Sequence, residues 1–415
     1  MSRHSEALAE FLTRHPLPGI AAAAREHDGP VLCVGGAIRD VLLSRPPADI
    51  DIVVGGDLDA FVDLFARHCG PRPVAIGDPW RDTRRTKVGN IQVDLGAMLG
   101  DETEDLAARD FTVNAMAVRL GGGELGGDRL QLIDPLGGVD DVSLRTIRML
   151  SAQALAADPL RMLRAVRYLA SLEGFGIDEL TLAAIRSRAA AIDEVAAERV
   201  QYEWAHLLQG AGWVTAVRVA VELGLFERTL GFASDLCGVD AWARREAAFS
   251  TRSGAEDLVV LRLAALLGGA PADAQEQVRE LLVERRWPRK LAHRATRVAA
   301  WAGHLADAPE TAVWALEDRQ SAGNAARLAR ALMDSCDSPG MERIVELETY
   351  AARAAEPPWV RGSDLREWGM GEGLELGDLL QQVTRGQLER RWESAAAARS
   401  WARRQAGAVG SKGSA

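Results

Sequence analysis

The fold of this chain is decided by two neighbouring segments, Val31-Leu-Cys-Val-Gly-Gly-Ala-Ile-Arg-Asp-Val-Leu-Leu43 and Ala48-Asp-Ile-Asp-Ile52. The first segment begins as an apolar run typical of a buried strand. It reaches two glycines and then continues with the apolar spacing of a short helix. The second segment is another apolar run, which carries two aspartates two residues apart. These patterns predict a strand, a glycine turn, a helix and a second strand in close succession.

The two aspartates, Asp49 and Asp51, point to the same face of the predicted strand, because side chains alternate along a strand. Ile50 and Ile52 then face the core. Two carboxylates on one face repel each other unless a cation lies between them, and Mg²⁺ prefers oxygen ligands that it shares with substrate phosphates. A D-x-D pair taken alone is more often a solvated strand face. Its closeness to the glycine turn makes Asp49 and Asp51 candidate metal ligands and catalytic residues.

A phosphate site is indicated beside this pair. Gly35 and Gly36 precede the start of a helix, where backbone N–H groups can approach phosphate oxygens. Arg39 supplies a cation that can bind phosphate through two N–H groups. Asp94 lies in a further predicted strand at 89–95. It is either a third metal ligand or the cap of a strand end, and both interpretations remain open.

The pattern of the chain changes near residue 148. Before it, strand and helix signals mix, with strands expected at 31–34, 48–54, 73–76, 89–95 and 130–133, helices at 5–27 and 58–68, and either structure at the start of 111–120. After it, apolar residues recur with helical spacing, at 159–172, 178–190, 197–208, 212–223, 257–267, 273–284 and 289–305. The expected fold class is α+β, a small mixed-sheet head followed by an all-α remainder.

Composition limits the partners and the compartment. A formal net charge of -10 argues against a purely electrostatic nucleic-acid binder. The four cysteines show no paired spacing, so we expect reduced thiols in a cytoplasmic protein and no zinc site. No apolar run approaches the ~20 residues that span a bilayer, so no membrane partner is expected.

Four motifs follow one another between residues 35 and 167, and Glu198-Arg199 with Glu203 extends the matching region to about residue 208. The four motifs are Gly35-Gly-x-x-Arg39 with Asp49-x-Asp51, Ala108-Arg-Asp-Phe-Thr-Val-Asn-Ala-Met-Ala117, Asp134-Pro-x-Gly-Gly-x-x-Asp141, and Asp158-Pro-Leu-Arg161-Met-Leu-Arg164-Ala-Val-Arg167. In this order they resemble the motifs of the class II tRNA nucleotidyltransferases and bacterial poly(A) polymerases, a branch of the polymerase-beta superfamily. The resemblance implies a nucleotidyltransferase head at 1–148, a helical neck at 149–210, a helical body at 211–350 and a tRNA-contacting tail at 351–406. The small and polar residues of 407–415 predict a disordered end.

The resemblance also implies an activity. Such an enzyme adds CMP and AMP from CTP and ATP to the 3′ end of tRNA without a template and releases pyrophosphate, with Mg²⁺ held by Asp49 and Asp51. Asp158 and Arg161 are three residues apart near a helix start, so their side chains are neighbours. Aspartate accepts from an exocyclic amine and arginine donates to a ring acceptor, a pattern that cytosine and adenine present but uracil and guanine do not. This pair is therefore expected to select the nucleotide.

More arginines are expected at the nucleotide. Arg109 is a candidate for phosphate or ribose, and Arg164 for the triphosphate. Arg167 lies nearly opposite Asp158 on the helix, so a triphosphate contact and an ion pair elsewhere are about equally expected. For Asp110, the alternative to a role in the nucleotide site is a structural ion pair with Arg109 or another neighbour. Arg145 and Arg148 extend a positive strip toward these residues, and Asn114 is expected to hold a backbone turn.

The basic residues of the helical body are interpreted as part of a solvated helix face, with RNA contact as the alternative. These residues are Arg285, Arg286, Arg289, Lys290, Arg294 and Arg297. Most of the tryptophans are expected to pack in the core, and base stacking is the alternative for a few of them.

Several alternatives stay open. The head motifs do not separate full CCA addition from CC-only addition, A-only addition or poly(A) synthesis, and the oligomeric state is undetermined. A non-catalytic RNA-binding protein is disfavoured by the two intact residue pairs. Ser44 stands where the family usually has glycine, and Ala157 where it usually has an acidic residue. Serine tolerates many turn conformations, so we expect no consequence from Ser44.

Overall fold

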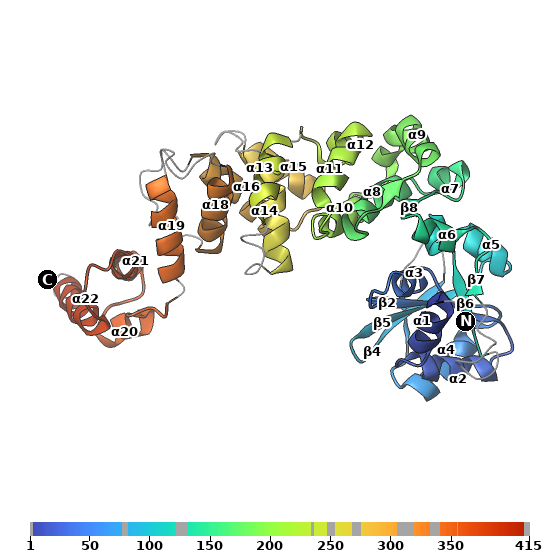
Figure 1. The fold of residues 1–415 in the computed structure, drawn as a ribbon. Coiled ribbons are helices and arrows are strands. Elements are labelled where there is room, and N and C mark those ends of the chain that lie inside the picture. Colours follow the sequence, from blue (N-terminus) through green and yellow to red (C-terminus); the bar gives the residue numbers. More distant parts are fainter. Residues whose placement is uncertain are drawn as a thin grey trace. The chain divides into compact units, whose positions relative to one another are not determined.

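The structure, a computed structural model, describes residues 3–76, 82–121, 132–233, 236–246, 254–267, 275–304, 319–332, 341–354 and 356–410. The chain forms two compact units (Figure 1). The first comprises Met1–Val195 with Leu223–Leu225, and the second Ala196–Glu222 with Phe226–Ala415. The neck expected over 149–210 is therefore shared between the two units.

A seven-stranded mixed sheet lies at the centre of the first unit, in the order β3-β4-β5-β2-β1-β6-β7. Its strands are β1 (Val31–Val34), β2 (Asp49–Val54), β3 (Val74–Ile76), β4 (Thr83–Val88), β5 (Ile91–Ala97), β6 (Ala117–Leu120) and β7 (Leu132–Ile133). β2 and β5 run parallel, and the other neighbours run antiparallel. β4 was not expected, because Thr83-Arg-Arg-Thr-Lys-Val88 has too few apolar residues to give a strand signal.

The register of β2 and β5 separates the acidic residues from the core. Ile50 and Ile52 are each 1% exposed, and they lie opposite the buried Val93 and Leu95 of β5. The same register places Asp51 opposite Asp94. The prediction that the isoleucines of this segment face the core is confirmed.

Two helices, α1 (Arg3–Leu12) and α2 (Leu17–Glu26), replace the single helix expected over 5–27. Pro16 lies between them and lacks the N–H that a continuous helix needs. α2 packs beside α4 (Leu58–Cys69), and both contact the sheet (Figure 1). The segment 111–120 contains both kinds of structure, a short 3-10 helix η1 (Thr112–Asn114) and then β6. The first residues of the strand expected over 130–133 lie outside the described residues.

The remainder of the first unit is mainly helical. It contains α3 (Gly36–Leu42), α5 (Glu102–Ala107), α6 (Gly138–Ser143), α7 (Ala152–Ala157), α8 (Leu160–Ser171), α9 (Glu179–Arg188) and η2 (Ala189–Glu194), with a small parallel sheet of β8 (Thr146–Ile147) and β9 (Gly176–Ile177). α8 buries Leu160, Leu163 and Val166 at helical spacing. This packing fixes which side of α8 presents its arginines.

The second unit is helical throughout its described residues. Its elements are α10 (Ala197–Leu207), α11 (Trp213–Glu222), α12 (Leu225–Leu230), α13 (Leu236–Glu246), α14 (Ala255–Leu267), α15 (Gln275–Glu284), α16 (Arg289–His304), α18 (Arg319–Leu332), α19 (Met341–Arg353), α20 (Gly362–Glu367), α21 (Leu374–Leu388) and α22 (Ala395–Gly410). A mixed-sheet head and a helical remainder confirm the predicted α+β class.

Two sequence expectations for this unit have clear outcomes. Trp204, Trp213, Trp242 and Trp287 are at most 2% exposed, so core packing is confirmed for these four. α22 continues to Gly410, whereas disorder was expected from residue 407. Alanine favours helix, and the last turns of α22 bury alanines four residues apart. No helix among the described residues is long and apolar enough to cross a membrane.

Candidate active site

The glycine turn between β1 and α3 lies against the candidate metal ligands. Gly35 has a φ of 74°, which glycine adopts without strain. A Cβ atom on Gly35 would lie 3.0 Å from Nη1 of Arg109 and 3.8 Å from Oδ2 of Asp51. The turn, a guanidinium and a carboxylate therefore border the same small volume, which a larger residue at position 35 would fill.

Asp49 is exposed and Asp51 is half-buried on the acidic face of β2. Burial raises the pKa of Asp51 to about 6; Arg109 opposes this rise, while the carboxylates of Asp49 and Asp94 add to it. A carboxylate that is costly to ionise here becomes easier to ionise when a cation binds beside it. The chemistry of this pair thus fits a divalent cation.

Asp94 faces the same side of the sheet but binds Arg85. Nε and Nη2 of Arg85 donate to the two carboxylate oxygens of Asp94 at 2.7 and 2.8 Å. Within the described residues, no three His, Cys, Asp or Glu side chains come close enough together to hold a metal ion. The structure therefore favours Asp94 as a neighbour of Asp51 over a third ligand. Asp94 lies in the middle of β5 and does not cap a strand end.

Arg109 has hydrogen-bonding capacity that the described protein leaves unused. Its Nη2 donates to Asp105 at 3.3 Å, while its Nε is buried and has no hydrogen-bond partner among the described residues. A buried N–H without a partner costs ~1–3 kcal/mol, which an anionic oxygen of a ligand would offset. This orphaned donor beside Gly35 fits the expected role in binding phosphate or ribose.

Arg39 is 8% exposed and is already bound on several sides. Its Nε and Nη2 donate to Asp40 at 3.0 and 2.9 Å, and its Nη1 donates to Asn114 at 2.7 Å. Asn114 therefore binds side chains as well as belonging to a turn. The guanidinium group lies close to Gly36 at the start of α3, where its charge adds to the electrostatic attraction for phosphate. The expected two-bond contact to phosphate competes with Asp40 for these donors.

Asp158 and Arg161 flank the start of α8, the helix expected to read the base. Asp158 accepts a hydrogen bond from the Leu160 backbone N–H at 3.3 Å. Nη1 and Nη2 of Arg161 donate to the backbone carbonyls of Arg109 and Ala108, both at 2.7 Å. Burial lowers the pKa of Arg161, and nearby carboxylates counter this effect. Arg161 is thus held in one orientation, and three of its five N–H groups remain for a base.

Asp110 pairs with Arg164, not with Arg109. Nε and Nη2 of Arg164 donate to the same Asp110 oxygen at 2.9 and 2.7 Å. Burial raises the pKa of Asp110, but Arg164 and the hydrogen bond from Asn114 outweigh it and hold the pKa at about 2. Asp110 therefore keeps its negative charge at every physiological pH and holds Arg164.

Arg167 lies against the ring of Tyr168, with its Cζ 4.4 Å from the ring centroid. This places Arg167 beside an aromatic face instead of beside Asp158. Tyr168 itself was missed in the sequence. Its position four residues after Arg164 on one helix was the available signal, because such residues are neighbours on a helix surface.

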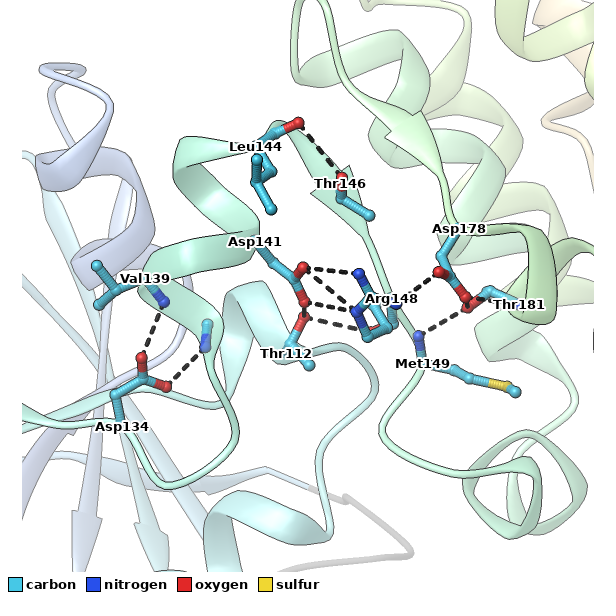
Figure 2. Close-up of polar contacts among 11 residues, drawn as sticks. Thr112, Asp134, Val139, Asp141, Leu144, Thr146, Arg148, Met149, Asp178 and Thr181 are labelled. Atoms are coloured by element: carbon cyan, nitrogen blue, oxygen red, sulfur yellow. Dashed lines mark hydrogen bonds and ion pairs between the residues drawn. The ribbon is translucent and has the colours of Figure 1, made fainter.

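The Asp134–Asp141 motif shapes the chain next to α8. Asp134 accepts hydrogen bonds from the backbone N–H groups of Gly138 and Val139 at 2.7 and 2.9 Å, which caps α6 (Figure 2). Asp141 accepts a hydrogen bond from Thr112 at 2.6 Å. The two aspartates of this motif therefore hold backbone and neighbouring side chains in place.

Arg148 connects α6 to α9. Its Nε donates to Asp141 at 3.0 Å and its Nη1 to Asp178 at 2.5 Å, and Figure 2 shows the guanidinium between the two carboxylates. Arg145 donates to the Glu173 carbonyl at 3.0 Å. These two members of the predicted positive strip bind protein groups, so the strip is weaker than the sequence suggested.

Two of the basic residues of the body, Arg294 and Arg286, differ in how far they are buried. Arg294 is 4% exposed and pairs with Glu256 at 2.8 Å and with Asp257. It is therefore a structural residue, and RNA contact by its side chain is excluded. Arg286 is exposed and pairs with Glu198 of α10 at 3.0 Å.

Comparisons with known proteins find similar sequences and a similar fold. Residues 31–148 match the family described as the Poly A polymerase head domain, and residues 174–234 match a family described as the probable RNA- and SrmB-binding site of polymerase A. The CC-adding tRNA nucleotidyltransferase of Geobacter sulfurreducens is 39% identical over 46% of this chain and 44% of its own. The CCA-adding enzyme of Latilactobacillus sakei is 31% identical over 58% of this chain and 61% of its own.

The chain thus spans about half the length of the curated relatives it matches. A solved structure, the CCA-adding enzyme of Thermotoga maritima complexed with tRNA_CCA, is similar over 96% of this chain and 97% of its own, with a TM-score of 0.70 and 21% identity. That likeness extends the shared fold beyond the segment that the sequence comparisons cover. The head segment, residues 31–148, is therefore similar to the head domain of poly(A) polymerases, and the sequence of the first half of the chain is similar to CC-adding and CCA-adding tRNA nucleotidyltransferases.

Proposed function

We propose that this protein is a template-independent nucleotidyltransferase that adds CMP and AMP, from CTP and ATP, to the 3′ end of tRNA and releases pyrophosphate. One observation carries the proposal. Arg161 of α8 is tied by two hydrogen bonds of 2.7 Å to the backbone at Ala108 and Arg109, while the side chain of Arg109 borders Gly35 and Asp51. Arg161, the candidate for base selection, and the candidate metal ligand Asp51 are thus both linked to Arg109, which supports one shared site.

Asp49 and Asp51 would hold Mg²⁺, with nucleotide phosphate oxygens and water as the further ligands. When bound, Mg²⁺ supplies charge neutralisation of the triphosphate and polarisation of the attacking RNA hydroxyl. The protein's own residues bind and orient the nucleotide. The backbone at Gly35 and Gly36 allows close approach of phosphate, and the orphaned Nε of Arg109 donates to an oxygen of phosphate or ribose.

Base selection falls to Asp158 and Arg161. The Asp158 carboxylate would accept from the exocyclic amine of cytosine or adenine, and an N–H group of Arg161 would donate to the adjacent ring nitrogen. Because backbone carbonyls fix Arg161, its remaining donors point in a set direction. Uracil and guanine would leave these groups mispaired, which costs affinity.

The acceptor is proposed to be the 3′ end of tRNA. Both curated relatives described above carry names that include CC or CCA addition, and the similar Thermotoga structure is a complex with tRNA. The match of residues 174–234 to an RNA-binding family supports an RNA partner. A cytoplasmic location fits such a substrate and the free thiols of Cys33 and Cys69.

Restricted addition is the second candidate. The relative from Geobacter is named as CC-adding and the relative from Latilactobacillus as CCA-adding. Similarity in the head is therefore compatible with either specificity. A-only addition and poly(A) synthesis use the same head motifs.

The deciding experiment offers purified protein tRNA that ends before CCA, after C and after CC, each with labelled CTP or ATP and Mg²⁺. Addition of all three nucleotides supports the proposal. Use of CTP alone identifies CC addition, and use of ATP only on the CC-ended tRNA identifies A addition. Long A tails on unrelated RNA identify poly(A) synthesis. Absence of transfer to any of these substrates contradicts the proposed activity.

A further inference from the structure

A single tyrosine hydroxyl binds one side chain of η1 and one arginine of α8 in the first unit. Tyr168 lies on α8 and is 5% exposed. Its hydroxyl oxygen accepts one hydrogen bond from Nδ2 of Asn114 at 2.9 Å and another from Nη2 of Arg164 at 3.2 Å. Asn114 belongs to η1, which follows the Arg109 motif, and Arg164 belongs to α8. The hydroxyl therefore connects two segments that are 50 residues apart in the sequence.

The Asn114 side-chain amide uses both of its donor hydrogens in contacts with its neighbours. Its Nδ2 donates to Asp110 and to Tyr168, both at 2.9 Å, and an amide nitrogen has two hydrogens to donate. Its Oδ1 accepts from Nη1 of Arg39 at 2.7 Å. Because these partners leave the amide one orientation, the position of the Tyr168 hydroxyl is transmitted to Arg39.

Arg164 is held in the same way from two sides. Asp110 accepts two of its hydrogen bonds at 2.9 and 2.7 Å, and Tyr168 accepts the third. Asp110 alone would allow the guanidinium to pivot about one carboxylate oxygen. The tyrosine contact removes that freedom, since three directed bonds define the plane of the group.

The ring of Tyr168 is itself immobilised. The edge of Phe111 meets it with centroids 5.8 Å apart and planes at 89°. The guanidinium carbons of Arg167 and Arg39 lie 4.4 and 5.4 Å from its centroid, within the ~6 Å range of cation–π attraction. The hydroxyl is therefore presented from a fixed ring.

We propose that Tyr168 is a positioning residue of the nucleotide site. Its hydroxyl sets the orientation of Arg164 and, through Asn114, of Arg39, so that both cations are arranged for the triphosphate before it binds. The inference rests on the proposed function but adds a residue and a bond that the proposed function does not require. It also explains why Arg39 and Arg164 carry protein partners: these contacts orient the two groups.

The test variant is Tyr168→Phe, which removes the hydroxyl and keeps the ring with its aromatic and cation–π contacts. We expect KM for CTP to rise ~5- to 10-fold and kcat to change less than ~2-fold, because orientation for phosphate binding affects ground state and transition state alike. The inhibition constant of inorganic tripolyphosphate with Mg²⁺ should rise by a similar factor. That of cytidine, which has no phosphate, should stay unchanged.

A double-mutant cycle tests whether Tyr168 acts through Arg164. Arg164→Lys keeps the positive charge but cannot make the same directed contacts. In that background the effect of Tyr168→Phe on KM should be smaller than in the wild type, because part of its target is gone. Fully additive effects would show that the two residues act independently and would overturn the proposal.

Tyr350→Phe is the matched control. Its hydroxyl donates to Glu346 at 3.2 Å on α19 of the second unit, so the variant also loses one tyrosine hydrogen bond. Its KM and tripolyphosphate inhibition should equal those of the wild type. An inactive wild type would contradict the proposed function. An active wild type with unchanged constants in Tyr168→Phe, or a loss confined to kcat and thermal stability, would overturn this inference alone.

Discussion

Arg164 donates two hydrogen bonds to one oxygen of Asp110, at 2.9 and 2.7 Å, across 54 residues of sequence. The pair links the motif that follows α5 to the helix that carries the proposed base-selecting residues. Asp110 is 6% exposed, so its charge depends on this partner. The stability of the first unit is therefore expected to depend on pH through this pair.

Asp110→Asn should lower the free energy of unfolding by about 1–2 kcal/mol at pH 7, a value reduced for the partial exposure of Arg164. The pKa of Asp110 is lowered to about 2 in the folded protein. Its stabilisation is therefore complete above the unfolded pKa near 4 and is lost as pH falls toward 2. Urea unfolding of wild type and variant at pH 7, 5 and 3 should show a difference that shrinks only below pH 4. Asp63→Asn, at an exposed pair with Arg72, is the control and should change stability little. A difference that is the same at all three pH values would contradict the assignment.

Asp51→Asn should abolish transfer and yet stabilise the metal-free protein. The pKa of Asp51 is raised to about 6, mainly by burial, so its neutral form is the favoured one in the fold. Its contribution is fully present below the unfolded pKa and is lost as pH rises through 6. At pH 8 we expect the variant to be more stable by on the order of 1–3 kcal/mol, and at pH 4 to match the wild type.

Thermal unfolding with and without Mg²⁺ at both pH values checks this prediction. Mg²⁺ should raise Tm of the wild type more at pH 8 than at pH 4, because protons compete for the carboxylate. It should leave Tm of Asp51→Asn unchanged. Measurable transfer by the variant, or an undiminished Mg²⁺ effect on its Tm, would remove Asp51 from the metal site.

Asp158→Ala should lose base choice more than it loses turnover. Removing the carboxylate deletes the acceptor for the exocyclic amine, while Arg161 stays tied to the backbone at Ala108 and Arg109. The ratio of kcat/KM for CTP over UTP should fall by at least ~10-fold, the value of one lost directed contact. Competition between labelled CTP and UTP on tRNA lacking CCA measures it. Ala157→Glu, at the neighbouring position, is a suitable comparison and should keep the preference for CTP. An unchanged ratio in Asp158→Ala would exclude this residue from selection.

Ser44→Gly should stabilise the protein. Ser44 follows α3 with a φ of 57°, in the left-handed region that costs a non-glycine residue roughly 1 kcal/mol. Against the expectation that serine is without consequence here, a glycine would fit this turn without strain. The greater entropy of glycine in the unfolded chain offsets roughly 0.5–1 kcal/mol of this, so a net gain of up to about 0.5 kcal/mol remains. Ser44→Ala keeps the strain and should show no gain in the same urea titration. A loss of stability in Ser44→Gly would mean that the exposed serine side chain outweighs the backbone.

Arg148→Met should destabilise the first unit by about 1–2 kcal/mol, after allowance for the partial exposure of Arg148. The variant leaves the buried carboxylate of Asp141 with Thr112 alone and breaks the connection to Asp178 (Figure 2). Chemical unfolding measures the loss. In the Asp141→Asn background the same change should cost less, because the charge that needs compensation is gone. Equal losses in both backgrounds would show that the pair is not coupled.

The sequence predicted most strands of the sheet but missed β4, which lies between β3 and β5. β1 matches its predicted range of 31–34, because four apolar residues ending at glycines are a strong local signal. β4 was not predicted, because a strand rich in arginine and threonine gives no local apolar pattern and is specified by its pairing with β5. The helix expected over 5–27 is divided at Pro16, a residue whose effect on a helix is itself local.

The candidate site likewise contains residues that the sequence predicted and contacts that it did not predict. The motifs placed Gly35, Asp49, Asp51, Asp158 and Arg161 among the site residues, because their types and spacing carry the chemistry. They did not show that Arg161 binds two backbone carbonyls, that Asp94 binds Arg85, or that Arg167 lies on Tyr168.

The glycine turn and the paired aspartates on one strand face were thus determined by the sequence itself, since strand alternation and glycine freedom depend on a few consecutive residues. Only the tertiary structure decided which partner each arginine holds. Asp110 and Arg164, or Asn114 and Tyr168, are brought together by the packing of α8 and η1, and no local pattern encodes a contact across 54 residues.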